Sequence, residues 1–316
     1  MRCSVFAMRL GGCTIALINL QYELVNPPNE AEEGFKFGRG TNFHVERVEF
    51  GDPGIRTNDE VLTREDGERF GRDYIDGRTI TFTINLLTYN DNAALLYAQM
   101  ERAWRTNDTG AGPSRQRAGV MSRLRMNRHG RPKFVYGRPR AIAATTGRVD
   151  QGWVPVTCTF KTESHRYYED ALKQNSITPA PPSSGGFTFP IIFPLTTVPM
   201  STQADIVHVE GDEDSFLVNR IDGPIVNPLI EVVGYWYVKC NITLLTGEYL
   251  EIDPRPWRRT VRKNGNIPMR GIFTPDSRRL SGQWLPPGVH QVVLKGTDPT
   301  GTARLTTSWH NTYTSW

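Results

Sequence analysis

A strict alternation of apolar and polar residues at positions 79–86 is the feature that most constrains the fold. Its apolar members are Ile80, Phe82, Ile84 and Leu86, and threonines and an asparagine stand between them. Successive side chains of a β-strand point to opposite faces of the sheet, so a period of two indicates a strand with one buried face. The same period recurs at 154–160 and at 305–309. The sequence therefore predicts a mainly β fold.

One segment of the first half has helical spacing instead. Its apolar residues recur three and four positions apart and are Ala93, Leu96, Tyr97, Met100 and Trp104. Asn90 or Asp91 can cap the first turn, and Asn107 to Gly110 can end the helix. We predict a single helix that lies across a sheet with this stripe in the core.

Composition predicts the division of the 316 residues into domains. A Pro-, Gly- and Ser-rich stretch follows Asn175, and proline and glycine there disfavour a regular strand. We predict an N-terminal β-rich domain with one α-helix at 1–175, a linker at 176–204 and a C-terminal β-sandwich at 205–316. Short apolar runs separated by turn signals favour the sandwich. Hairpins are expected at Gly211–Asp214, Thr246–Gly247 and Asn264–Gly265.

No cluster of reactive residues is recognisable, which favours a role other than catalysis. The sequence has no P-loop, no G-x-S-x-G and no H-E-x-x-H, and its six histidines are scattered. The four cysteines form no C-x-x-C pair and are expected to be reduced thiols. The acidic run 210–214 lacks the spacing of a calcium loop and is expected to be a solvated turn. We predict no enzyme activity, no cofactor and no metal.

The charge and the apolar segments bear on possible partners. The formal net charge is only +4, which by itself predicts no nucleic-acid partner. No segment reaches the roughly 18 consecutive apolar residues of a membrane helix. We expect no membrane partner and no sequence-specific nucleic-acid binding.

The segment 109–149 is the most unusual in composition, because it is rich in arginine and contains no Asp or Glu. Three interpretations stay open: docking to an acidic protein neighbour or to another copy, an exposed basic loop, and nucleic-acid binding. We predict an assembly interface whose residues are Arg115, Arg117, Arg123, Arg125, Arg128 and Arg131.

Two blocks of sequence carry a family resemblance. The first runs from GDPGIRTNDE at position 51 through GRDYIDGRTITFTINL, and FVYGRPRAI and WVPVTCTFKTESHRYYED follow it. The second holds DGPIVNPLIEV, LLTGEYLEIDPRPWRRTVRKNG, WLPPGVHQVVLKG and ARLTTSWHNTYTSW, in this order. Together they resemble the distal tail protein family of siphophages, especially the minor tail proteins of phages of actinobacteria. The resemblance covers nearly the whole chain.

The resemblance implies a structural role in the virion. In that family the N-terminal belt domain forms a closed ring, a hexamer, at the distal end of a long non-contractile tail, and the C-terminal domain is a galectin-like β-sandwich. The implied partners are other copies of the chain, the tail tube protein and the tail-associated hub protein, with the tape measure protein as a further candidate. The implied location is the phage tail tip, assembled in the host cytoplasm.

Two other functions stay open beside the structural one. A galectin-like sandwich allows a carbohydrate-binding adhesin module, although fold alone does not imply sugar binding. Trp236, Trp257, Trp284 and Trp309 are candidates for stacking on a sugar, but core or edge packing is the expected role of each. The third alternative is a cell-wall glycosidase, since paired carboxylates can lie far apart in sequence.

Overall fold

The computed structural model describes residues 16–26, 34–64, 66–87, 93–105, 120–144, 153–178, 204–269, 271–298 and 300–316. The chain forms two compact units. Unit 1 holds Met1–Asp170 and Tyr313–Trp316, and unit 2 holds Ala171–Thr312. The predicted boundaries differ in two respects. The strand Lys173–Ile177 pairs inside unit 2, and Tyr313–Trp316 belong to unit 1. Most of the predicted linker lies outside the described residues.

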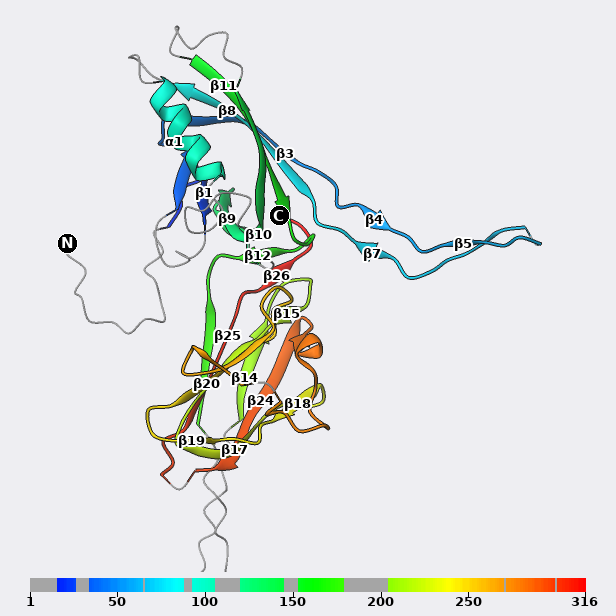
Figure 1. Cartoon of the computed structure of the whole chain (residues 1–316), viewed down its shortest axis with the longest axis vertical. Helices are drawn as coiled ribbons and strands as arrows, with labels where there is room; N and C mark the ends of the chain where they lie inside the picture. The colour runs from blue at the N-terminus through cyan, green and yellow to red at the C-terminus, as the bar shows by residue number, and fades with distance from the viewer. Residues whose placement is uncertain are drawn as a thin grey trace, which may run out of the picture. The chain divides into compact units, whose positions relative to one another are not determined.

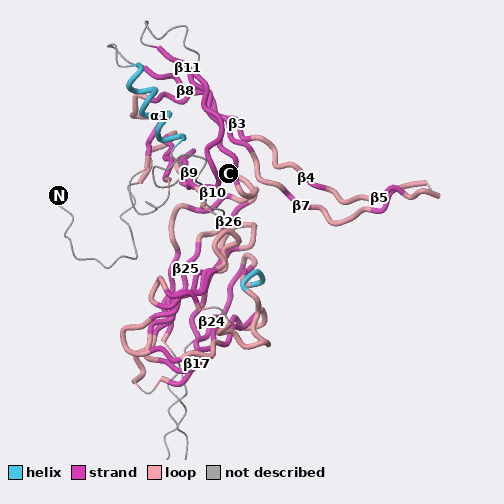
Figure 2. The backbone as a smooth tube through the Cα atoms, viewed as in Figure 1, coloured by secondary structure: helices cyan, strands magenta, loops and turns pink. Residues whose placement is uncertain are grey.

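Unit 1 is built on one antiparallel sheet (Figures 1 and 2). Its path runs β2-β1-β9-β10-β11-β8-β3. The members are β1 (Gln21–Val25), β2 (Phe35–Gly38), β3 (Phe43–Phe50), β8 (Thr79–Leu87), β9 (Ser122–Arg128), β10 (Arg131–Ala144) and β11 (Trp153–Thr162), and β12 (Tyr167–Glu169) pairs with β10. The predicted strands at 79–86 and 154–160 are confirmed, and they are neighbours, with Val156 opposite Ile84.

The helix α1 (Ala93–Arg105) lies on one face of this sheet, as predicted (Figure 1). Ala93, Met100 and Trp104 are its buried residues. The indole Nε1 of Trp104 donates a hydrogen bond of 3.2 Å to the carbonyl of Thr159 on β11. Beneath the helix the core is rich in aromatic rings, and Phe82 packs edge-on against Trp104. The predicted capping residues lie outside the described part of the chain.

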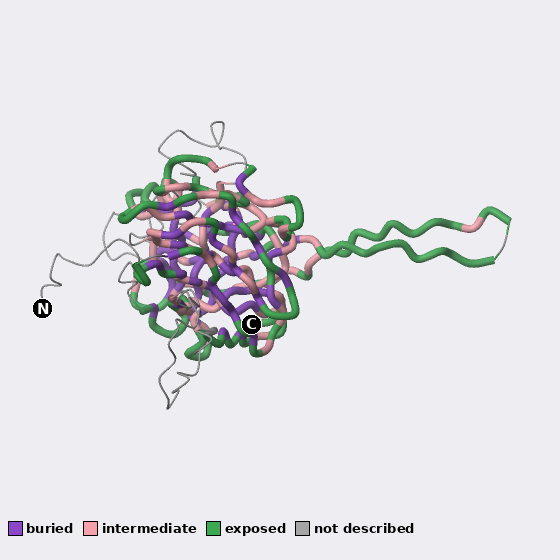
Figure 3. Tube along the Cα trace, turned by 90° about the horizontal axis from the view of Figure 1, so that it is seen from below, coloured by how far each residue is buried: buried purple, intermediate pink, exposed green. Residues whose placement is uncertain are grey.

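The strands β3 and β8 continue beyond the sheet as a long two-stranded arm, residues 51–78. Its paired segments are β4 (Ile55–Arg56) with β7 (Tyr74–Ile75), and β5 (Glu60–Val61) with β6 (Glu68–Arg69). The described residues of the arm are mostly exposed along both of its strands (Figure 3). The arm therefore receives little packing from unit 1.

The described residues of unit 2 form two main sheets and one helical turn. The first sheet has the order β13-β25-β16-β20-β21-β22, and the second has the order β14-β24-β17-β18 with β19 on β17. The members are β13 (Lys173–Ile177), β14 (Ala204–Val209), β15 (Ser215–Phe216), β16 (Val218–Asp222), β17 (Ile225–Val232), β18 (Trp236–Lys239), β19 (Thr243–Leu244), β20 (Tyr249–Asp253), β21 (Thr260–Lys263), β22 (Ile267–Pro268), the 3-10 helix η3 (Leu280–Gly282), β23 (Trp284–Leu285), β24 (Gly288–Thr297) and β25 (Arg304–Trp309). The short β15 pairs with β23, and β26 (Thr312–Tyr313) spans the second unit boundary.

The core of unit 2 is aliphatic and takes residues from both main sheets. Ile221 and Leu250 come from the first sheet, and Ile230 and Val292 come from the second. The fold class is therefore as predicted: mainly β, with one α-helix in the first unit and a sandwich in the second.

Two of the three hairpins predicted for this region are wrong. Thr246–Gly247 joins β19 to β20, which lie in different sheets, and Gly211–Asp214 joins β14 to β15, which pair with different strands. The first turn therefore carries the chain from the second main sheet to the first, and the second turn carries it from the second main sheet to the small β15–β23 sheet. Asn264–Gly265 does close a hairpin, in which Lys263 faces Ile267.

Candidate functional site

The arm offers an exposed apolar surface in unit 1. Five large apolar side chains on it are exposed: Ile55 (64%), Val61 (67%), Phe70 (83%), Tyr74 (50%) and Ile75 (52%). A two-stranded hairpin is marginally stable by itself in water, and clustered exposed apolar groups mark interaction sites. The arm is therefore suited to being covered by another protein surface.

Few polar contacts hold the arm together. Arg56 forms an ion pair of 2.7 Å with Asp76 across β4 and β7. The guanidinium groups of Arg56 and Arg72 lie over the ring of Tyr74, at 5.9 and 5.4 Å from its centroid. All of these groups are exposed, so each contact contributes about 0–1 kcal/mol.

The arm was not predicted from the sequence as a separate element. The sequence pattern that could have indicated the arm is the apolar pair Tyr74–Ile75 beside Phe70 within a highly charged stretch. Apolar side chains in such a stretch are exposed, as these three are in the structure.

Arg125, one of the predicted interface residues, lies inside unit 1. Its side chain is 2% exposed and stands between Glu23 and Asp170. Its Nε and Nη2 donate to the two carboxylate oxygens of Asp170 at 2.8 and 2.7 Å, and its Nη1 donates to Glu23. Burial lowers the pKa of the guanidinium, but both carboxylates outweigh this and raise the pKa overall. In this structure Arg125 neutralises buried acids.

The other predicted arginines do not form one exposed patch with it. Arg123 lies over the ring of Phe134 at 5.5 Å and Arg128 over that of Phe50 at 4.9 Å, and both arginines are half-buried. Arg131 is exposed beside the turn between β9 and β10. Arg115 and Arg117 lie outside the described residues. An interface role for these five stays a prediction.

Tyr313–Trp316 are fixed to unit 1 by aromatic and cationic contacts. The ammonium group of Lys133 lies 3.8 Å from the ring centroid of Tyr313 and donates 2.9 Å to the carbonyl of Ser315. Trp316 packs edge-on against Tyr167, with ring centroids 5.5 Å apart. Tyr313–Trp316 are therefore part of the fold of unit 1.

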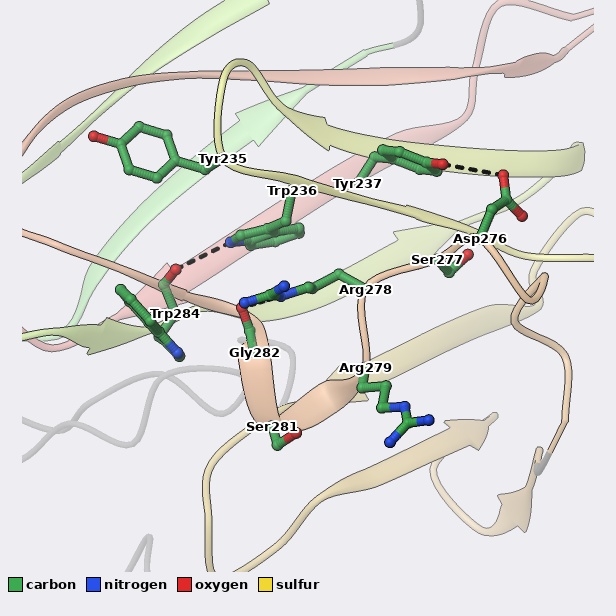
Figure 4. A pocket seen from close by; sticks show the side chains of 10 residues that line it. All are labelled: Tyr235, Trp236, Tyr237, Asp276, Ser277, Arg278, Arg279, Ser281, Gly282 and Trp284. Carbon is green, nitrogen blue, oxygen red and sulfur yellow. Dashed lines mark hydrogen bonds between the residues drawn. The ribbon is translucent and has the colours of Figure 1, made fainter. Parts of the chain in front are cut away.

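Three of the four candidate stacking tryptophans in unit 2 are wholly or partly packed. Trp236 is 7% exposed and Trp309 6% exposed, and both belong to the core, while Trp257 is half-buried. Trp284 is 36% exposed and lines a pocket with an open side (Figure 4). Its carbonyl accepts a hydrogen bond of 3.0 Å from Nε1 of Trp236.

The described residues show no metal-ligand cluster of three or more His, Cys, Asp or Glu side chains. In the acidic run, the amides of Asp212 and Glu213 donate to the carbonyl of Thr312. Cys158 and Cys240 are buried free thiols, and burial raises the pKa of Cys240 to about 12. No helix in the described ranges is long and apolar enough to cross a membrane.

Comparisons with known proteins agree with this architecture. No family model and no curated protein matches the sequence. The fold is similar to that of the Dit protein of phage SPP1, described as a paradigm of the hub adsorption apparatus in phages infecting Gram-positive bacteria. The TM-score is 0.55 at 11% identity, over 92% of this chain and 98% of that one.

A second likeness is to a chain of the phage P2 baseplate in its activated conformation with strontium. The TM-score is 0.52 at 10% identity, over 91% of this chain and 97% of that one. The chain thus has the fold of phage tail-tip proteins, and more particularly that of a distal tail protein. The predicted resemblance is confirmed for the fold.

Proposed function

We propose that this chain is a structural protein of a phage tail tip, where copies of it assemble into a ring. The main support for this proposal is the extent of the structural likeness to the SPP1 protein. The likeness spans more than nine-tenths of both chains, so both units are matched together. Because the sequence resembles the distal tail protein family, we propose that the ring is a hexamer. It joins the tail tube to the hub and host-recognition proteins in the virion and assembles in the host cytoplasm, with the tape measure protein as a further partner. The role is non-enzymatic.

The arm supports self-assembly on physical grounds. A closed ring needs a heterologous interface, in which one surface of a subunit meets a different surface of the next. The arm presents its apolar residues beyond the sheet of its own unit, so another subunit can cover them. Covering one large apolar side chain is worth about 1.5–3 kcal/mol, which makes the arm a strong contributor to such an interface.

Native mass spectrometry and electron microscopy of the purified full chain test this. We expect rings for the wild type and loss of rings for the double variant Phe70→Ser, Ile75→Ser. Both side chains are exposed, so the variant should keep its fold. The matched control is Leu245→Ser, Val289→Ser, which removes two exposed apolar side chains from unit 2 and should leave rings intact.

Two results would contradict the proposal. One is a chain that stays monomeric even when mixed with tail tube and hub proteins of its own virion. The other is a map of the virion in which this polypeptide lies away from the tail tip. Rings that survive the arm variant would overturn the role of the arm and leave the ring itself supported.

A further inference from the structure

The pocket in unit 2 combines exposed aromatic rings with charged side chains. It has a volume of about 560 Å³ and lies where β18 meets the segment 276–284. Small-molecule sites commonly occupy roughly 300–1,000 Å³ and combine apolar walls with a few fixed polar groups. Tyr235, Tyr237 and Trp284 supply exposed aromatic surface, and they are 53%, 37% and 36% exposed. Buried Trp236 also lines it.

The two charged groups of the pocket differ in how they are engaged. Asp276 accepts a hydrogen bond of 3.1 Å from the hydroxyl of Tyr237. Hydrogen bonds from Thr274 and Tyr237 hold the pKa of Asp276 below its usual range, so it is an ionised acceptor at neutral pH. Arg278 has no acidic partner among the described residues. Its Nε contacts only the carbonyl of Gly282, at 3.4 Å, and its other donors remain available.

The positions of Arg278 and Trp284 suit a ligand that combines a sugar ring with a carboxylate. Figure 4 shows the Arg278 side chain running between the indole of Trp236 and Gly282 toward Trp284, whereas Arg279 points away. A guanidinium binds a carboxylate through two parallel hydrogen bonds. An exposed aromatic ring packs against the apolar C–H face of a pyranose, and its face carries partial negative charge that attracts those hydrogens.

The wall that carries Arg278 is held in place before any ligand arrives. The amide of Arg278 donates 2.9 Å to the carbonyl of Tyr237, and the amide of Lys239 donates 2.9 Å to the hydroxyl of Ser277. Gln283 is fully buried, and its Nε2 donates 3.0 Å to the carbonyl of Arg278. A fixed wall lowers the ordering cost of binding.

We propose that this pocket binds an acidic saccharide, with Arg278 pairing with the carboxylate of a uronic acid and Trp284 packing on its sugar ring. Asp276 then accepts a sugar hydroxyl. This assigns to unit 2 a contact with acidic glycans that does not depend on ring assembly. A Cβ at position 282 would lie 2.3 Å from Nε of Arg278, so a larger residue there would shift this side chain.

Calorimetric titration of the full chain with trigalacturonic acid tests the proposal, and the fully methyl-esterified trisaccharide is the matched neutral probe. We expect binding of the acid and at least about tenfold weaker binding of the ester, since the ester cannot form the charge-assisted hydrogen bonds with Arg278. Arg278→Ala should weaken binding of the acid by a similar factor. Gly282→Ala should also weaken it, because it displaces Arg278 without removing the charge.

Trp284→Ala should reduce binding of the acid and of any weakly bound ester alike. The carbonyl that accepts from Trp236 belongs to the backbone, so this variant keeps that hydrogen bond. The control is Arg304→Ala, which removes an exposed arginine of unit 2 outside the pocket and should change nothing. Unchanged thermal unfolding shows that each variant is folded.

The proposal is overturned if the chain binds no acid at millimolar concentration, or if acid and ester bind equally. It is also overturned if Arg278→Ala binds like the wild type. Inorganic phosphate that competes fully with the acid at equal concentration would show a general anion site and refute recognition of the sugar. Ring assembly is measured separately and is unaffected by any of these outcomes.

Discussion

Unit 1 and unit 2 both enclose a β-rich core, but they fill it with different side chains. In unit 1 the rings of Tyr22, Phe37, Phe82 and Trp104 contact one another beneath the helix. In unit 2 the core consists mainly of Val, Ile and Leu from two facing sheets. A cylindrical helix on a twisted sheet leaves uneven gaps that large rings fill, whereas facing sheets interdigitate short branched side chains. Contacts between aromatic rings are therefore a feature of the core of unit 1.

The two units also bury charge differently. Unit 1 buries Arg125 between two acids from distant parts of the chain. Unit 2 buries the carboxylate of Asp298, which is 3% exposed and accepts hydrogen bonds from its own turn. Loss of the first group disturbs tertiary packing, and loss of the second disturbs a local turn.

The largest effect is expected from Trp104→Ala. This change removes the ring contacts with Phe37 and Phe82 and the hydrogen bond to Thr159, and it should lower the free energy of unfolding of unit 1 by about 3–5 kcal/mol. Hydrogen exchange by mass spectrometry at increasing denaturant reads each unit separately. Leu95→Ala on the same helix is the control, because Leu95 is 69% exposed. An equal loss of unfolding free energy in both units would contradict the prediction that Trp104 stabilises unit 1 alone.

The second largest effect is expected from Arg125→Met, which should lower the free energy of unfolding of unit 1 by about 3 kcal/mol. It leaves Glu23 and Asp170 without their cation while keeping most of the apolar stem, and an uncompensated buried charge is costly. The control is Arg47→Met, since Arg47 pairs with Glu49 at the surface with 71% of its side chain exposed. A variant as stable as the wild type at neutral pH would show that the acids find other partners or water.

The sequence allowed the strands and the helix to be predicted because each has its own period. The alternation at 79–86 and the stripe from Ala93 to Trp104 are local patterns, and local patterns survive in the fold. Which strand pairs with which is a long-range property. Thr246–Gly247 therefore looked like a hairpin turn although its two flanking strands lie in different sheets.

The candidate sites were harder to predict for the same reason. Arg125 looked like a surface cation because its two acidic partners are 102 and 45 residues away in the chain. The pocket was represented in the sequence only by Trp236 and Trp284 as separate tryptophans. The segment that brings Arg278 beside Trp284 has no motif of its own, so only the structure places these groups together.

A smaller and pH-dependent effect is expected from Asp298→Asn. The carboxylate accepts from Thr300 and from the amide of Ala303 at 2.8 Å. Burial raises the pKa of Asp298, but these hydrogen bonds outweigh it and lower the pKa overall. The ionised form therefore stabilises unit 2 above the unfolded-state pKa of about 3.9, and this contribution is lost as pH falls through the lower folded-state pKa.

We expect Asp298→Asn to lower the free energy of unfolding of unit 2 by about 1.5–3 kcal/mol at neutral pH. The difference in unfolding free energy from the wild type should shrink below about pH 4. Denaturant unfolding at several pH values, followed by hydrogen exchange in unit 2 peptides, measures this. Asp222→Asn is the control, because Asp222 pairs with Arg220 in a half-exposed position. A difference that stays constant down to low pH would show that the charge of Asp298 plays no part.

The smallest effect, and the sharpest test of independence between the units, concerns two thiols. Cys158 lies in unit 1 and Cys240 in unit 2, and burial raises the pKa of both, that of Cys240 to about 12. At pH 8 the thiol of Cys240 is therefore almost entirely protonated in the folded state, and the thiolate is the reactive form. Alkylation therefore requires local unfolding.

Peptide mapping separates the two cysteines in the labelling experiment. Arg125→Met should speed the labelling of Cys158 and leave that of Cys240 unchanged, and Asp298→Asn should speed the labelling of Cys240 and leave that of Cys158 unchanged. Parallel acceleration of both thiols in either variant would show that the units unfold as one.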